Sequence, residues 1–336
     1  MLIADDPEYR ALLAYAARIG RDPALVQGAG GNVSLKRDGI LWVKASGAWL
    51  AEAESQAIMA PVRLDPMLAA LHGADPAAAE DMTPFVEASL NPSGLRPSIE
   101  TTMHGALPHP VVVHVHCVET MAWAARTDCE QALAPLLAGL RWRFVPYVRP
   151  GAPLTRAILA HVAVDADVLV LGSHGLVVGG ADTATAARLL QEVARRLRRS
   201  VRGAPKPDHE TLAGMAEGTP YRPAEAAAQG SGTDPLSFAV AQTGSLYPDH
   251  VIFLGPGVVT TLPRPSDRPA AMVVAPNVGV LLRRDASPGA AALARCLADV
   301  TARLHPSEPL SVLTAAQERE LLGWDAEQYR QGLDRA

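Results

Sequence analysis

Two histidines close the β-branched run "VVVHVHCVET", residues 111–120, and a single residue separates them. In a β-strand, residues i and i+2 point to the same face of the sheet. His114 and His116 can therefore share one ligand if the chain supplies further donors. Taken alone, the pair is more typical of two imidazoles that make ordinary hydrogen bonds on a sheet face.

A third histidine favours a metal site. His174, in "VLGSHGLVV", lies at the end of another β-branched run, directly before a glycine that permits a tight turn. Two neighbouring strand ends can bring three imidazoles to the Zn–N distance of about 2.0–2.1 Å. Three protein ligands leave one coordination position open, as in catalytic zinc sites. The sequence therefore predicts a metal site of His114, His116 and His174.

One carboxylate, Glu100, precedes the histidine strand on the short helix predicted in "SIETTMHGAL", with Ser98 as its N-cap. Glu100 can act as a fourth ligand, as a general base, or as both in turn. The alternative is an acid in the first turn of a helix that only complements the helix dipole.

Two loops of small residues come earlier in the chain. In "QGAGGNVS" the backbone N–H groups can form an anion-binding nest, although a plain tight turn explains the glycines equally well. The loop "VKASGAWL" offers Lys44 as a cation and Ser46 and Gly47 as small donors. Two such loops beside a metal site predict a phosphorylated or polyhydroxylated small molecule as substrate.

The elements that must position these residues alternate between helices and strands. Apolar spacing predicts a helix over 6–20, and "VSLKRDGILWVKAS" predicts two strands around a tight turn. The alternation continues to a long helix and predicts a layered α/β domain over 1–205. Residues 206–235, rich in Pro, Gly and Ala, predict a linker. Strands such as "HVIFLG" and "AAMVVAP", followed by the helix "GAAALARCLADVTARL", predict a smaller α/β unit over 236–336.

Composition excludes several classes of protein. A chain of 336 residues with 49% hydrophobic content can bury one large core or two modest ones. The net charge of −5, without a dominant basic patch, argues against nucleic-acid or polybasic membrane binding. Three cysteines without CxxC spacing argue against a disulfide framework and favour the reducing cytoplasm. P-loop, GxGxxG and GxSxG motifs in their required contexts are not found.

The ordered motifs "GAGGNVS", "VKASG", "PSIETTMHG", "HVHC" and "GSHGLVVGG" resemble the class II aldolase/adducin family over roughly residues 8–200. Within that family, "LWVKASG", "PSIETTMH" and "VPYVRPG" look most like the aldolase part of the bifunctional rhamnulose-phosphate aldolase/dehydrogenases, and we expect no dehydrogenase part. The resemblance implies a three-layer α/β/α fold for the main domain.

The resemblance also implies the roles of particular residues. One Zn²⁺ per chain would be held by His114, His116 and His174, and Glu100 would move protons. The phosphate-binding elements of the family fall on Gly30, Gly31, Asn32, Ser46, Gly47 and Ser98. The tyrosine that fuculose-phosphate-type members place after HxH has no obvious counterpart here. Tyr147, in the following strand, is the candidate to replace it.

These observations predict a cytoplasmic, zinc-dependent aldehyde-lyase that cleaves a small sugar phosphate through a metal-stabilised enediolate. A sugar-phosphate epimerase or dehydratase on the same fold, and an adducin-like binding protein without catalysis, are the alternatives. The expected partners are a small phosphorylated sugar or aldehyde and further copies of the chain, in a homo-oligomer such as a tetramer. Neither nucleic acid nor a membrane is expected as a partner.

Overall fold

The computed structural model describes residues 3–73, 80–161, 165–263 and 270–335. The chain forms two compact units, each of which draws on two separate segments. The first unit consists of 1–117 and 132–196, and the second of 118–131 and 197–336. Among the described residues, no helix is both long enough and apolar enough to span a membrane.

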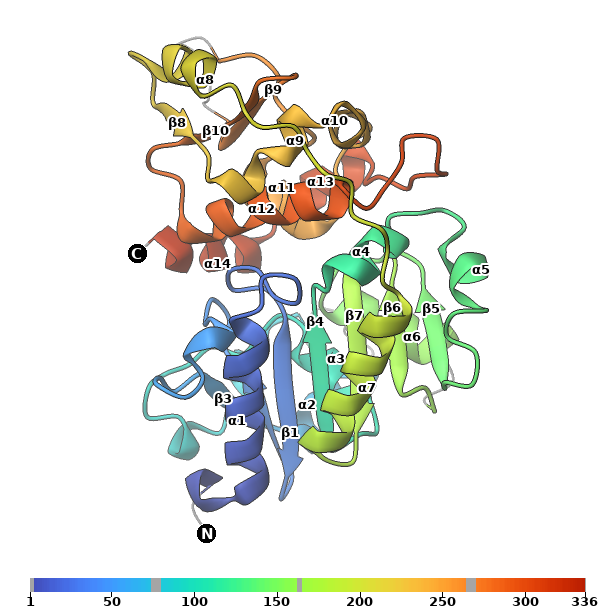
Figure 1. Ribbon diagram of the computed structural model, residues 1–336. Helices are drawn as coiled ribbons and strands as arrows, with labels where there is room; N and C mark the ends of the chain where they lie inside the picture. The colour runs from blue at the N-terminus through green and yellow to red at the C-terminus, as the bar shows by residue number, and fades with distance from the viewer. Residues whose placement is uncertain (1–2, 74–79, 162–164, 264–269, 336) are drawn as a thin grey trace. The chain divides into compact units, whose positions relative to one another are not determined.

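The first unit is built on a seven-stranded sheet (Figure 1). In spatial order its strands are β3 Met59–Arg63, β2 Ile40–Lys44, β1 Asn32–Arg37, β4 Val111–Val115, β7 Gly175–Gly180, β6 Val168–Leu171 and β5 Trp142–Val145. Neighbouring strands are antiparallel except β5 and β6, which are parallel. This order places β1 and β7 on either side of β4, the strand that carries His114.

Helices cover both faces of this sheet, which confirms the α/β fold class. α1 Pro7–Gly20 and α7 Thr183–Arg196 pack on one face, and α2 Leu64–His72, α3 Thr101–Ala106 and α6 Ala152–His161 pack on the other (Figure 1). The carboxylate of Asp6 caps α1 by accepting hydrogen bonds from the N–H groups of Glu8 and Tyr9. The unit also has short 3-10 helices at η1 Ile3–Asp5, η2 Leu50–Glu52, η4 Thr83–Phe85 and η5 Ala88–Leu90.

A buried apolar core joins the sheet to α3 and α6. It includes Val112 of β4 and Val177 of β7, together with Met103 and Leu154 from the two helices. All five residues of β4 are buried, because the sheet is covered on both faces. His114 is two residues beyond Val112, so it lies on the same face of the sheet as the side chains that pack against α3.

The second unit contains a three-stranded antiparallel sheet in the order β8 Tyr221–Pro223, β10 Gly279–Arg283 and β9 Met272–Ala275. Its helices are α4 Val118–Ala124, α8 His209–Ala216, η6 Ala226–Ala228, α9 Gly230–Thr233, α10 Pro235–Gln242, α11 Pro248–Leu254, α12 Pro288–Thr301, α13 Ala315–Leu322 and α14 Asp325–Arg335. The boundary between the units passes through α5 Cys129–Leu133.

Two segments of this unit differ from the sequence-based expectation. Residues 206–235 form α8, β8, η6 and α9 where the composition predicts a linker. Small residues serve close packing here: a Cβ at Gly232 would come within 2.2 Å of the backbone oxygen of Gly279. The strand predicted in "HVIFLG" is wrong, because these residues belong to α11. All seven residues of α11 are buried, so the helix shows no amphipathic period, and Pro248 at its start is the helical signal.

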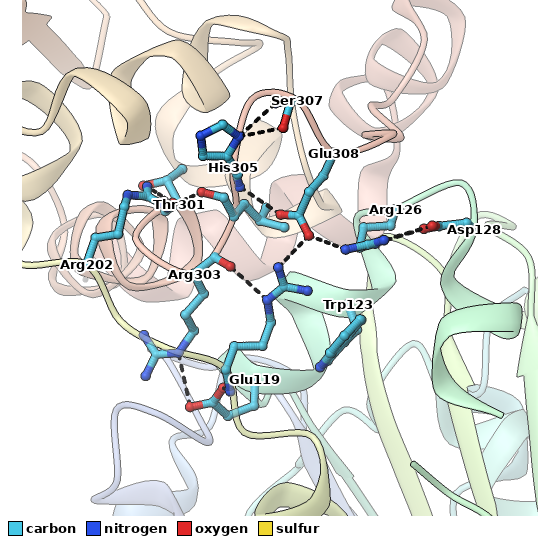
Figure 2. Close-up of polar contacts among 12 residues, drawn as sticks. Glu119, Trp123, Arg126, Asp128, Arg202, Thr301, Arg303, His305, Ser307 and Glu308 are labelled. Atoms are coloured by element: carbon cyan, nitrogen blue, oxygen red, sulfur yellow. Dashed lines mark hydrogen bonds and ion pairs between the residues drawn. The ribbon is translucent and has the colours of Figure 1, made fainter. Parts of the chain in front are cut away.

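An ion-pair cluster holds α4 within the second unit (Figure 2). We define the α4 cluster as Glu119, Arg126, Arg199, Arg303 and Glu308. The Glu119 carboxylate accepts hydrogen bonds from Arg303 Nε at 3.0 Å and from the Arg199 N–H at 2.8 Å. Glu308 accepts from the guanidinium groups of Arg126 and Arg199. The cluster thus joins α4 to residues that follow it by 75 positions or more along the chain.

The indole of Trp123 contacts two of these arginines. The guanidinium carbon of Arg199 is 4.3 Å from the centroid of the Trp123 ring, and that of Arg126 is 5.3 Å away. Both distances fall within the range of a cation–π contact. The backbone after α4 also pairs with residues 309–311, where the N–H of Thr127 donates to the carbonyl of Pro309 at 2.7 Å.

Candidate metal centre

Three histidines meet where the strands β4, β6 and β7 of the first unit begin or end. His114 is the fourth residue of β4, His116 follows that strand, and His174 lies in the turn between β6 and β7. Their ring centroids are 4.9, 5.0 and 5.4 Å apart. One ring nitrogen of each lies within 4.8 Å of the other two, and all three side chains are buried. The structure therefore brings together the three ligands that the sequence predicts.

The β6–β7 turn carries His174 to this position. Leu171 pairs with Gly175, so the turn is only three residues long, and Ser173 within it has a φ of 48°. A Cβ at Gly175 would come within 2.6 Å of the carbonyl oxygen of Val115 and 3.2 Å of the His114 ring. Glycine at 175 thus lets β7 begin directly against the strand that carries the other two histidines.

A backbone contact defines the orientation of the His114 ring. Its Nδ1 lies 3.1 Å from the carbonyl oxygen of Leu176. A carbonyl oxygen only accepts, so Nδ1 carries the proton and Nε2 is the ring nitrogen that can bind a metal. A histidine that binds a metal usually donates its other N–H to such an acceptor.

Glu100 lies against two of the histidines. Its Oε2 is 3.4 Å from His114 Nε2, and its Oε1 is 3.4 Å from His174 Nε2. Burial raises the pKa of Glu100, but the three histidines and a hydrogen bond from Asn32 together lower that pKa from 4.5 to about 2. Oε1 accepts no hydrogen bond from any described residue. A buried carboxylate oxygen that accepts no hydrogen bond is energetically costly. Together with three imidazoles it forms a set of ligands that fits a divalent cation.

Hydrogen bonds extend from Glu100 into the interior of the first unit. Asn32 Nδ2 donates to Glu100 Oε2 at 2.8 Å and to Ser98 Oγ at 3.2 Å. Asn32 Oδ1 contacts His104 Nε2, and His104 Nδ1 lies 2.7 Å from Ser34 Oγ. Asn32 and Ser34 are two residues apart on β1, so both side chains point toward α3, which carries His104. Sequence reasoning did not single out Ser34 or His104 as functional residues.

The glycine-rich loop packs directly behind the histidine strand. Gln27 Nε2 donates to the carbonyl of His116 at 3.2 Å. A Cβ at Gly30 would lie 2.8 Å from His116 Nδ1, and one at Gly31 would lie 2.8 Å from the carbonyl oxygen of His114. Gly31 also has a φ of 62°. The predicted substrate loop thus borders the three-histidine cluster.

A second group of predicted substrate residues lies around Lys44. Its ammonium group is buried and donates to the carbonyls of Ala29 and Ala48, both at 2.7 Å. These bonds tie the glycine-rich loop to the loop that contains Ser46 and Gly47. The carbonyl of Lys44 accepts from the N–H of Ser98 at 3.2 Å. The contact with substrate predicted for Lys44 remains a prediction.

Two further predictions concern Ser98 and Tyr147. Ser98 is not the N-cap of α3, which begins at Thr101 with Glu100 in the cap position. The Ser98 hydroxyl instead accepts hydrogen bonds from Asn32 and from the N–H of Glu100. Tyr147 lies beyond the end of β5, the edge strand, and β6 and β7 separate β5 from β4. Its role as general acid remains a prediction.

Comparison with known proteins identifies the family. Residues 11–201 match the model of the class II aldolase and adducin N-terminal domain, which is more than half of the chain. The chain belongs to this family. The matched region contains all three histidines and Glu100, so the metal-centre geometry described above lies within the class II aldolase domain.

Individual relatives match about half of this chain. The chain is 31% identical over 179 residues to a Bacillus subtilis (strain 168) protein described as the uncharacterized oxidoreductase YuxG. That match covers 50% of this chain but 26% of the relative. Among solved structures, the N-terminal class II aldolase domain of a conserved Thermoplasma acidophilum protein is 26% identical, with a TM-score of 0.49, and the match covers 57% of this chain and 92% of that one. The l-fuculose-1-phosphate aldolase of Thermus thermophilus is 17% identical, with a TM-score of 0.37, over 56% and 92% of the two chains.

Proposed function

We propose that this chain is a Zn²⁺-dependent aldehyde-lyase that cleaves a small phosphorylated ketose. The observation that carries the proposal is the convergence of three buried imidazoles on Glu100, whose two oxygens each lie 3.4 Å from a histidine nitrogen. Imidazole nitrogen suits zinc, and three protein ligands leave room for a substrate oxygen. Membership of the class II aldolase family supports this reaction class.

Each group in the site has a distinct role in this proposal. His114, His116 and His174 would hold the zinc, which would supply Lewis-acid polarisation of the substrate carbonyl and would offset the negative charge that develops as the C–C bond breaks. Glu100 moves the proton at the carbon beside the carbonyl, which it can do because its carboxylate faces the histidine cluster. The proposed phosphate-binding set consists of Gly30, Gly31, Asn32, Ser46, Gly47 and Ser98. Tyr147 is the proposed general acid. An aldehyde leaves first, and dihydroxyacetone phosphate follows.

The experiment measures both metal and reaction products. Purified protein should contain about one zinc per chain, release dihydroxyacetone phosphate from at least one ketose 1-phosphate, and lose that activity with a chelator. An inverted substrate without cleavage would identify an epimerase, and loss of water would identify a dehydratase. Protein that neither contains nor takes up a divalent metal would exclude all three enzymes and favour a binding protein.

A pair of histidine variants provides the matched control. His114→Ala removes a buried ligand and should abolish both metal binding and cleavage. His72→Ala removes an exposed histidine at the end of α2 and should change neither. Equal metal content in the two variants would rule out the three-histidine site.

The proposal includes assembly and location. Homo-oligomers, with a tetramer as the first candidate, are expected from the family resemblance, and sedimentation at micromolar concentration should show a species larger than the 35.3 kDa chain. The three cysteines are buried, and none is joined in a disulfide. We place the protein in the cytoplasm, where thiols stay reduced.

A further inference from the structure

The hydrogen bonds that join Glu100, Asn32 and His104 allow only one assignment of donors and acceptors. The amide nitrogen of Asn32 donates to Glu100 Oε2 and Ser98 Oγ, which places the amide oxygen toward His104. The opposite orientation of the amide would set its oxygen against the carboxylate oxygen, with no proton between them. The carboxylate therefore determines which way the Asn32 amide faces.

This orientation defines the tautomer of His104. An amide oxygen only accepts, so the proton between Asn32 Oδ1 and His104 must be on Nε2. Nδ1 of the same ring then accepts the hydroxyl proton of Ser34, 2.7 Å away. Burial, the largest influence, lowers the pKa of His104 from 6.5 to about 3, so the ring is neutral at neutral pH and has one proton to place.

From this chain of bonds we infer that His104 is a positioning residue for Glu100. As the Nε2–H tautomer it locks the Asn32 amide, and the locked amide holds the Glu100 carboxylate toward His114 and His174. Ser34 stabilises this tautomer by donating its hydroxyl proton to Nδ1. The inference rests on the proposed function, because positioning matters only if Glu100 moves a proton.

The elements support this role because the four members are buried on two neighbouring segments, β1 and the start of α3. Ser34 and Asn32 belong to β1, His104 to α3, and Glu100 to the residue directly before α3. Ser34 and His104 are fully buried, and Asn32 and Glu100 are 3% and 5% exposed. Water therefore does not compete for these hydrogen bonds, and losing one leaves a buried polar group unsatisfied.

The first test reads the tautomer directly and requires no activity. In protein labelled with ¹⁵N-histidine, the His104 signals, assigned by their loss in His104→Gln, should show a protonated Nε2 and an unprotonated Nδ1. Ser34→Ala should shift the Nδ1 resonance, because Nδ1 loses its hydrogen-bond donor, and should leave Nε2 protonated. A His104 ring protonated on Nδ1, or on both nitrogens, in the unaltered protein would overturn the inference even if the lyase proposal held.

The second test separates positioning from simple stability. His104→Leu should reduce kcat by about 10–100-fold with little change in KM. His104→Gln keeps a side-chain N–H for Asn32 and should recover a large part of kcat. Equal loss in the two variants, or full kcat in His104→Leu, would overturn the positioning role. If the unaltered protein cleaves no sugar phosphate, the proposed function fails while the tautomer experiment still decides the inference.

Discussion

Glu100 is the residue whose two possible roles can be separated by one change. Glu100→Gln keeps the shape of the side chain but removes the base. We expect the variant to retain metal and to lose about 10²–10⁴-fold in turnover, because general acid–base catalysis contributes that much. Elemental analysis and initial rates on the same samples provide the measurement. Loss of zinc, with normal turnover once zinc is restored, would make Glu100 a ligand only and leave Tyr147 as the residue to test.

Site residues that form a recognisable motif in the sequence could be predicted. Residues that only the fold brings into contact could not. His114, His116, His174 and Glu100 stood out because an HxH pair, a histidine before glycine and an isolated acid are visible in the sequence. His104 did not, because its partners on β1 precede it by 70 and 72 positions. A weak signal existed: Glu100 and His104 are four residues apart, as on one helix face.

At the scale of elements, helices and strands could be predicted where an element has one polar face or is bounded by a clear turn. The helix α1, the β1–β2 hairpin and the β6–β7 pair are confirmed. The error at α11 has the opposite cause, because a fully buried helix of seven residues has the same apolar sequence as a buried strand.

The glycine-rich loop gives a prediction that belongs to this scale. Gly31 and Gly39 have φ values of 62° and 75°, so alanine at either position costs about 1–2 kcal/mol of backbone strain. A Cβ at Gly39 has no atom within 4 Å, whereas one at Gly31 meets the carbonyl oxygen of His114. Gly31→Ala should therefore also weaken metal binding, and Gly39→Ala should not. Titration of the metal-free variants with Zn²⁺ checks this, and equal affinities would contradict it.

At the scale of the whole molecule, the second unit carries a pH-dependent term in stability. Burial lowers the pKa of His250 from 6.5 to about 4, and its Nε2 donates to the carbonyl of Gly257 at 2.8 Å. Between pH 4 and pH 6.5 the His250 side chain is mostly protonated in the unfolded chain and mostly neutral in the folded chain. The stabilisation is therefore complete above pH 6.5 and is lost as the pH falls toward 4, by about 3 kcal/mol in all.

Urea unfolding between about pH 5 and pH 7 measures this effect. His250→Gln keeps an amide in the buried position but cannot titrate, so its unfolding free energy should fall less steeply as the pH is lowered. His305→Gln, at a histidine exposed in the same unit, is the matched control and should keep the original slope. Parallel pH profiles for the unaltered protein and His250→Gln would show that His250 contributes nothing to acid sensitivity.

The placement of α4 has a consequence for any attempt to recombine this protein. Because 118–131 belongs to the second unit and 132–196 returns to the first, the backbone passes between the units three times. A graft that replaced everything after residue 196 would remove the contact of Arg199 with Trp123. It would also remove the ion pairs of Arg303 with Glu119 and of Glu308 with Arg126. A viable chimera has to transplant 118–131 and 197–336 as a matched pair, so recombination between distant relatives at a single junction should yield insoluble products.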